Sequence, residues 1–296
     1  LNRPDSILKP EDFLVIKANW ENKDRNLLEI AEELNIGTDS LVFVDDNPAE
    51  RHIASSRVPG VKVPELADAA GFITTLDRAG YFEVTNLSAD DLERNRMYQA
   101  NAERKKQEAS YANYADYLLS LEMDAQICPF APVYMARIAQ LTNKSNQFNL
   151  TTKRCSQSDI ERIAEDASYI TLYGRLEDRF GDNGVVSVVF GHRDAEDETL
   201  FHIDLWLMSC RVLKRDMEFA MMDELVSQCA ARGLKRLKGY YYPTAKNGMV
   251  KDFYGMQGFT QTGGDAEGNT EWEFVIPERY EKKNKVIKVN GELPTA

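Results

Sequence analysis

The stretch that most constrains the fold is "LVFVDDNPAER" at Leu41–Arg51. Its four apolar residues, Leu41–Val44, predict a buried β-strand that ends at two adjacent aspartates. Asn47, Pro48 and Glu50 then predict a helix start, because asparagine caps helices, proline suits the first helical position and glutamate suits the third. A helical pattern precedes this strand and another strand pattern follows the helix, so we expect an α/β fold with a parallel sheet.

The bulk composition narrows the functional classes. With 43% hydrophobic and 28% charged residues, the 296-residue chain is typical of a soluble globular protein with room for two domains. No apolar run approaches the ~20 residues of a membrane helix, and the start lacks a signal-peptide pattern, so we expect a cytoplasmic protein without a membrane partner. The formal net charge of −12 disfavours nucleic acid as a partner, because phosphate contacts need a cationic surface.

The cysteines and histidines argue against a zinc site. The four cysteines are far apart in the sequence, and the three histidines form no cluster with metal-ligand spacing. Thiols in a reducing compartment are therefore the expected state.

The sequence predicts two domains. Residues 1–86 are expected to form a partial α/β domain and residues 113–280 a second one. A polar helix at 87–112, with a capping box at Ser88 and Asp91, is expected to connect them, and the lysine-rich tail at 281–296 is expected to be frayed.

The predicted elements follow from hydrophobic periodicity. "GDNG" at Gly181–Gly184 predicts a turn between two strands. The expected strands, beyond Leu41–Val44, are Val61–Leu66, Tyr169–Tyr173, Val185–Phe190, Phe201–Leu207, Leu237–Tyr241 and Glu271–Ile276. The expected helices in the second domain are Val133–Leu141, Ser158–Glu165, Glu218–Ala231 and Asn247–Met256.

The paired aspartates have a chemical interpretation. Carboxylates at the end of a strand can bind Mg²⁺, and Lys23 could neutralise charge on a phosphoryl group. Asp45 and Asp46 are therefore candidate ligands of a weak Mg²⁺ site. The alternative is that they only favour the positive end of the next helix.

Long motifs then identify a resemblance. "WENKDRNLLEIAEELNIGTDSLVFVDDNPAER" at Trp20–Arg51 resembles the third and fourth motifs of a haloacid-dehalogenase-type phosphatase, and more narrowly the FkbH-like proteins of polyketide biosynthesis. Similarity to that family continues through "QLTNKSNQFNLTTKR", "DRFGDNGVVSVV", "LWLMSCRV", "YYPTAKN" and "DFYGMQGF". It implies a truncated Rossmann-like parallel sheet followed by a domain like the GCN5-related acetyltransferases. It also implies transfer of a glyceryl unit from a phosphorylated three-carbon acid to an acyl carrier protein.

One family motif is absent. Such phosphatases carry D-x-D-x-T/V, whose leading aspartate attacks phosphorus, and these 296 residues contain no such motif. We therefore expect the chain to begin partway through the phosphatase domain, with Lys23, Asp45 and Asp46 as a remnant of that site.

The acetyltransferase resemblance directs attention to Arg211–Asp216. In that family a loop of the form Arg/Gln-x-x-Gly-x-Gly/Ala binds the pyrophosphate of coenzyme A through backbone N–H groups. Here Lys214 and Asp216 occupy both glycine positions, whereas the cations Arg211, Lys214 and Arg215 remain. This pattern could suit the phosphopantetheine of a carrier protein, which has no pyrophosphate. The alternative is a solvated basic stretch.

Cys210 is the candidate nucleophile. Arg211, Lys214 and a following helix N-terminus would favour its thiolate, which could carry an acyl group. The alternative is a small packed residue. His202, on the strand leading to Cys210, is a weaker candidate general base.

Polar side chains provide further candidate contacts to pantetheine or substrate. An amide-rich stretch, which could instead satisfy a bent backbone, holds Asn143, Asn146, Gln147 and Asn149. Before the last predicted helix, Lys246 could face a phosphate and Asn247 is the expected N-cap.

Together these features predict an acyltransferase that moves a glyceryl unit to a carrier-protein thiol, with an incomplete phosphatase half. Two alternatives stay open: an N-acyltransferase that uses acyl-coenzyme A, and a non-catalytic module that docks a carrier protein.

Overall fold

The computed structural model describes residues 3, 5–66, 68–83 and 92–292. The chain divides into two compact units, Leu1–Ala102 and Glu103–Ala296, which are described separately. The division lies within helix α5 (Arg94–Glu108), part of the stretch predicted as a helical connector. The predicted capping box at Ser88 and Asp91 lies outside the described residues. No helix in the described ranges is long and apolar enough to cross a membrane.

The first unit is built from short helices around a small core. The predicted parallel pairing is present but is reduced to one bridge between Val42 and Lys62, so Leu41–Val44 and Val61–Leu66 are not full strands. The Phe43 N–H donates to the Lys62 carbonyl at 2.8 Å. The elements are η1 (Pro10–Asp12), α1 (Lys23–Leu34), η2 (Thr38–Ser40), α2 (Pro48–Arg57), η3 (Ala69–Gly71) and α3 (Phe72–Ala79), with Leu27, Ala54 and Val58 buried between them.

The second unit is an α/β domain organised around one mixed sheet. Its described strands run in the order β7-β8-β6-β5-β4-β3-β1-β9, and β2 pairs with β5. Among these described strands, only β5·β6 and β1·β9 pair in parallel. The strands are β1 (Asp124–Cys128), β2 (Phe148–Asn149), β3 (Tyr169–Asp178), β4 (Gly181–Arg193), β5 (Leu200–Met208), β6 (Arg236–Tyr241), β7 (Thr260–Gly264), β8 (Thr270–Val275) and β9 (Lys288–Val289).

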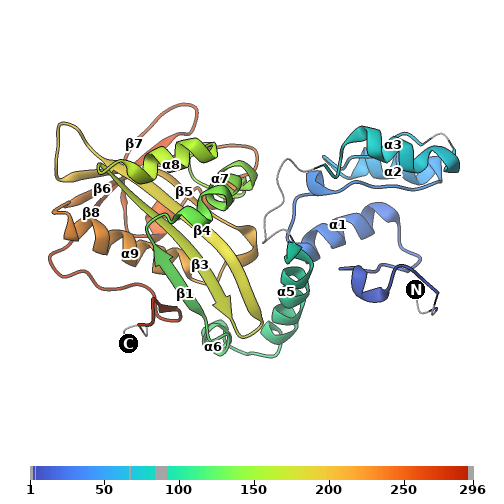
Figure 1. Cartoon of the computed structure of the whole chain (residues 1–296), viewed down its shortest axis with the longest axis horizontal. Coiled ribbons are helices and arrows are strands. Elements are labelled where there is room, and N and C mark those ends of the chain that lie inside the picture. The colour runs from blue at the N-terminus through green and yellow to red at the C-terminus, as the bar shows by residue number, and fades with distance from the viewer. Residues whose placement is uncertain (1–2, 4, 67, 84–91, 293–296) are drawn as a thin grey trace. The chain divides into compact units, whose positions relative to one another are not determined.

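Helices cover both faces of this sheet (Figure 1). α7 (Met135–Lys144) and α8 (Gln157–Glu165) lie between β1 and β3 in the chain and bury one face, whereas α9 (Met217–Ala231) crosses from β5 to β6 on the other. This arrangement confirms the predicted α/β fold class for the second unit. The remaining described elements are α6 (Tyr114–Ser120), η4 (Pro132–Tyr134), η5 (Cys210–Val212), η6 (Gly248–Val250) and α10 (Phe253–Met256).

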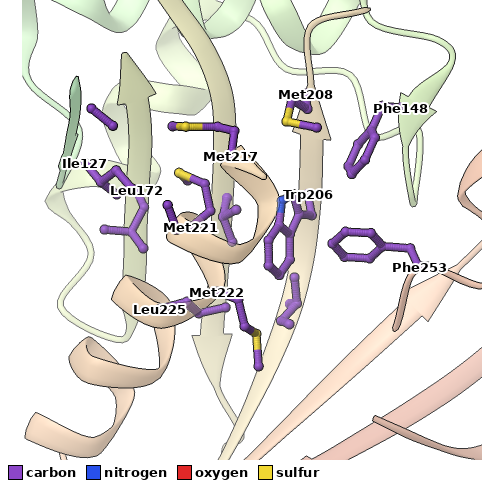
Figure 2. Close-up of a cluster of buried hydrophobic side chains, with 14 of the residues drawn as sticks. Ile127, Phe148, Leu172, Trp206, Met208, Met217, Met221, Met222, Leu225 and Phe253 are labelled. Carbon is purple, nitrogen blue, oxygen red and sulfur yellow. The ribbon is translucent and has the colours of Figure 1, made fainter. Parts of the chain in front are cut away.

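The larger core lies under α9. Figure 2 shows Met217, Met221 and Met222 of this helix facing the sheet, where Trp206 stands beside Phe253. The two aromatic rings meet edge to face with centroids 4.9 Å apart. Each fully buried side chain of this size stabilises the fold by roughly 1.5–3 kcal/mol, so the core fixes where β5 ends and where α9 begins.

Two sequence predictions were wrong: the position of the turn between β3 and β4, and the frayed C-terminal tail. The turn between β3 and β4 lies at Arg179–Phe180, and Gly181–Gly184 instead opens β4. The tail at 281–292 is not frayed: β9 pairs with β1, and Ile287 is fully buried. The sequence pattern hides this ordering, because isolated apolar residues such as Ile287 find their partners only in the folded domain.

The centre of the sheet has two irregularities. β5 and β6 pair only at Leu200–His202, and farther along β5 its free edge pairs with β2 instead. A register shift between β4 and β5 leaves Asp204 as an extra residue on β5, which is a β-bulge. Bulges re-aim side chains, and beyond this one Leu205 and Leu207 face the core under α7 and α8, whereas Trp206 and Met208 face the core under α9.

Candidate functional site

Cys210 lies directly after β5, in the turn η5. Its side chain is half-buried. The hydroxyl of Ser209 caps this turn by accepting hydrogen bonds from the backbone N–H and Nε of Arg211, at 3.4 and 3.3 Å. The following helix, α9, begins at Met217, close to its predicted start at Glu218, so its N-terminus does not directly follow Cys210 in the chain. The position places a thiol at the strand end, beside one cationic side chain.

The loop after Cys210 keeps a glycine-like backbone without glycine. Lys214 has φ +64° and Asp216 has φ +61°, both in the left-handed region that side chains other than glycine, asparagine and aspartate rarely adopt. These are the two positions at which the acetyltransferase pattern has glycine or alanine. The hydroxyl of Tyr114 donates to the Lys214 carbonyl at 2.5 Å and helps to hold this conformation.

Arg215 does not point to a ligand. It is buried and donates to Asp178 at 3.1 Å and to the Arg211 carbonyl at 2.8 Å. Arg104 binds the same carboxylate through two nitrogens, at 2.8 and 2.6 Å. Burial and the nearby Arg104 charge lower the pKa of Arg215 to about 10. Arg215 therefore anchors the loop, and the expected basic patch is reduced to Arg211 and the exposed Lys214.

Carboxylates stand at the start of α9. Asp216 is its N-cap residue and Glu218 lies in its first turn. Burial raises the pKa of both groups, and one Glu218 oxygen is buried without a hydrogen-bond partner among the described residues. Acidic groups here complement the positive end of the helix and compete with any phosphate for it.

His202 does not sit where a base for Cys210 would be. It lies near the start of β5, and a rise of ~3.3 Å per residue places it roughly 20 Å from the strand end that leads to Cys210. Both ring nitrogens are engaged: Nδ1 bonds to the Tyr240 hydroxyl at 2.6 Å and Nε2 to Asp194 at 2.8 Å. Burial raises the pKa of Tyr240 to about 12, so its hydroxyl stays protonated.

His192 was missed by the sequence reasoning. It is the register partner of His202 across the β4–β5 hairpin, and the two rings stack with centroids 5.1 Å apart. Its Nδ1 bonds to Asp204 at 2.9 Å. A usable signal was present, because acidic turn residues lie midway between the two histidines and predict that they face each other.

The amide-rich stretch mainly satisfies a bent backbone. Asn143 donates to the carbonyls of Ala139 and Cys155, at 2.9 and 2.8 Å. Asn149 is fully buried, with its Nδ2 on the Ser145 carbonyl and its Oδ1 on a backbone N–H. The side-chain oxygen of Asn146 accepts a hydrogen bond from the guanidinium group of Arg154. Gln147 is half-buried and leaves its amide as the best remaining candidate for a ligand contact.

Asn247 also serves the backbone. It is fully buried, and its side chain donates to the carbonyls of Asn149 and Tyr242, both at 2.9 Å. Asn247 occupies the N-cap position of η6, as predicted, but its side chain makes no cap bond there. Lys246 is exposed beside it.

The paired aspartates of the first unit are used in a helix start. Asp45 accepts the Asn47 N–H at 2.8 Å, and Asn47 caps α2 as predicted, with Pro48 next. Arg51 donates to the carbonyls of Asp45 and Asp46, at 2.8 and 3.1 Å. Lys23 opens α1. Among the described residues no three His, Cys, Asp or Glu side chains gather as metal ligands, so the carboxylates present do not make a complete site.

Known proteins resemble parts of the chain. An acetyltransferase of the GNAT family from Streptococcus pneumoniae aligns over 52% of this chain and 100% of its own, with 15% identity and a TM-score of 0.42. The GNAT domain of PAT from S. lividans aligns over 50% and 89%, with 16% identity and a TM-score of 0.41.

A third similar structure is the N-terminal part of a Bacteroides fragilis protein containing a phosphatase domain, complexed with Mg. It covers 29% of this chain and 23% of its own length, with 45% identity and a TM-score of 0.28. No family model matches the chain, and no curated protein matches it. The chain is thus similar in separate parts to GNAT acetyltransferases and to a phosphatase-domain protein.

Proposed function

We propose that the second unit transfers an acyl group, specifically the glyceryl group of a phosphorylated three-carbon acid, to the phosphopantetheine thiol of an acyl carrier protein. The observation that carries this proposal is the position of Cys210. It follows the central strand β5 in a capped turn, is half-buried rather than enclosed, and adjoins Arg211. The donor and the carrier come from the resemblance to FkbH-like proteins.

The chemistry needs a donor whose carboxyl group carries the phosphate. The Cys210 thiolate attacks the acyl carbon, a carbon–sulfur bond forms, the carbon–oxygen bond to phosphate breaks, and phosphate leaves. The carrier thiolate then attacks this thioester and releases Cys210. The second step exchanges one thioester for another and is nearly balanced, so it needs no other energy source.

The α9 start supports a ligand without pyrophosphate. Asp216 and Glu218 place carboxyl groups where the acetyltransferase pattern would bind two phosphates, and Arg215 is held inside by Asp178. Arg211 and Lys214 remain near the surface to meet a single phosphodiester.

One observation favours the alternative, an N-acyltransferase that uses acyl-coenzyme A. The positive φ angles of Lys214 and Asp216 keep the backbone shape of a glycine loop. Replacing both residues by glycine in one variant separates the two functions. If side chains alone exclude pyrophosphate, the double variant gains affinity for acetyl-coenzyme A in calorimetry and the native chain binds it weakly.

The first unit is proposed to keep only a remnant of a phosphatase site. Asp45, Asp46 and Lys23 could hold Mg²⁺ weakly together with water and a phosphate, which is how Mg²⁺ usually binds. Asp45 already serves the start of α2, and this weakens the case for a metal.

Intact-mass spectrometry tests the proposal. The chain is incubated with an acyl phosphate of a three-carbon hydroxy acid, alone and then with a phosphopantetheine-loaded carrier protein. The native chain should gain the acyl mass and pass it on, and Cys210→Ser should do neither. Acylation of an amine from acetyl-coenzyme A would instead establish the N-acyltransferase. Carrier binding without any transfer would establish a docking module.

A further inference from the structure

A cavity of about 350 Å³ lies beside α8, away from Cys210. Its lining includes Lys153, Asp159, Arg162, Asp166 and Tyr169. This volume falls in the range of small-molecule sites, and the lining is rich in charge. The proposed transfer at Cys210 uses none of these residues.

The carboxylates of this cavity are already satisfied by the chain. Asp159 accepts from the hydroxyl and N–H of Ser156, at 2.7 and 3.0 Å. Asp166 accepts from the N–H and hydroxyl of Ser168, at 2.9 and 2.7 Å. These hydrogen bonds lower the pKa of both carboxyl groups, so both stay ionised. Each carboxylate already accepts hydrogen bonds from the chain itself.

The cations of the cavity have spare donors. Among the described residues, Lys153 pairs with Asp204 at a long 3.5 Å and its ammonium lies 5.5 Å from the centre of the Phe190 ring, and its side chain is 45% exposed. Arg162 pairs with Asp159 at 3.0 Å, its one hydrogen-bonded partner in the described ranges, and its side chain is 77% exposed. Ammonium and guanidinium groups carry three and five N–H donors, so a small oxyanion would find donors here that the chain does not use.

His192 is outside the lining but lies next to Tyr169, which is part of the lining. The His192 ring lies 5.7 Å from that of Tyr169, and its Nδ1 is held by Asp204, the carboxylate that Lys153 also reaches. Across the described ranges, Nε2 of His192 has no hydrogen-bond partner, and the side chain is 39% exposed. A carboxylate on Nδ1 fixes the tautomer in which Nε2 is a hydrogen-bond acceptor.

We propose that this cavity is a second ligand site, which binds a small hydroxylated oxyanion. Lys153 and Arg162 hold the carboxylate or phosphate of the ligand, and Nε2 of His192 accepts a hydrogen bond from its hydroxyl. The Asp204 bulge aims the carboxylate that orients the imidazole. The ring of His202 stacks on that of His192. Because both nitrogens of His202 are hydrogen-bonded to Tyr240 and Asp194, it contributes packing and no ligand contact.

Diethyl pyrocarbonate tests the site, because it ethoxyformylates an accessible unprotonated imidazole nitrogen. The chain has only three histidines, and two serve as internal references. His52 is exposed in the first unit, and His202 has both nitrogens engaged. Peptide mapping of the native chain should show fast labelling of His192 and slow labelling of His202.

Protection then identifies the ligand class. Lactate, a hydroxylated carboxylate, should slow labelling of His192 about tenfold at ten times its dissociation constant, and should leave His52 unchanged. Acetate, a carboxylate without a hydroxyl, should protect more weakly, because it can bind the cations but cannot donate a hydrogen bond to Nε2 of His192. Lys153→Met should weaken protection by lactate, whereas Lys251→Met, an exposed cation outside the lining, should not.

Two results would overturn the proposal. One is labelling of His192 as slow as that of His202, which would mean that Nε2 is not open. The other is equal protection of His192 and His52 by both anions, which would mean a general salt effect. Because the readout does not involve Cys210 or an acyl donor, it stands apart from the proposed transfer.

Discussion

Asp178→Asn should be among the most destabilising changes of a charged residue in the second unit. Asp178 is buried and accepts two bonds from Arg104, one from Arg215 and one from the Phe180 N–H at 2.9 Å. Asparagine keeps the shape but removes the charge, so two buried guanidinium groups lose their shared carboxylate. Breaking a buried ion pair in this way costs about 3–5 kcal/mol of the free energy of unfolding.

Urea unfolding followed by tryptophan fluorescence measures this cost. Trp206 and Trp272 report on the second unit, whereas Trp20 is fully exposed in the first. Glu103→Gln is the matched control, because Glu103 forms an exposed pair with Lys106 on the same helix as Arg104, and such pairs contribute about 0–1 kcal/mol. A loss below about 1 kcal/mol in Asp178→Asn, similar to the control, would refute the reasoning that this carboxylate anchors α5 and the Cys210 loop.

Four further outcomes are expected. Gly239→Ala should destabilise the second unit by about 1–3 kcal/mol in the same assay, because the added carbon would overlap the buried ring of Tyr254, whereas Gly248→Ala, with open space around it, should not. Iodoacetamide at neutral pH should label Cys210 before Cys155 and Cys229, because burial raises the pKa of both reference thiols; equal rates would contradict this. Backbone N–H groups and His202 lower the pKa of Asp194 to about 2, below its usual value near 3.8, so its stabilising contribution is present above pH ~4 and is lost toward pH 2; acid unfolding of Asp194→Asn should lack this component. Any slow hydrolysis of a generic phosphate ester should be unchanged by Asp45→Asn, and a loss of turnover would show that the first unit is more than a remnant.

The regular elements of the second unit were predictable because their hydrophobic periodicity is strong. The buried runs Val185–Phe190 and Phe201–Leu207 lie within β4 and β5, and Glu218–Ala231 lies within α9. β1 and β9 were missed because both are short and depend on long-range pairing: β1 pairs with β3 and β9, and β9 pairs with β1.

The roles of polar residues were harder to predict. Asn149, Arg215 and Asn247 fit a ligand role in the sequence, yet each is buried against backbone or an ion pair. Nothing local in the sequence distinguishes an amide that binds a ligand from one that satisfies a bent backbone. The place of His192 depends on the register of the β4–β5 hairpin, in which it lies opposite His202. A sequence pattern gives that register only when the turn between the two strands is placed correctly.

The central claim is that Cys210 carries the acyl group, and peptide mapping of the acylated chain tests it most directly. The chain is incubated with the three-carbon acyl phosphate, digested at mildly acidic pH to preserve thioesters, and mapped by tandem mass spectrometry. We predict one acylated peptide, with the acyl mass on Cys210, removed by hydroxylamine and by the carrier thiol. An acyl group on another cysteine, or full transfer to the carrier by Cys210→Ser, would contradict the account.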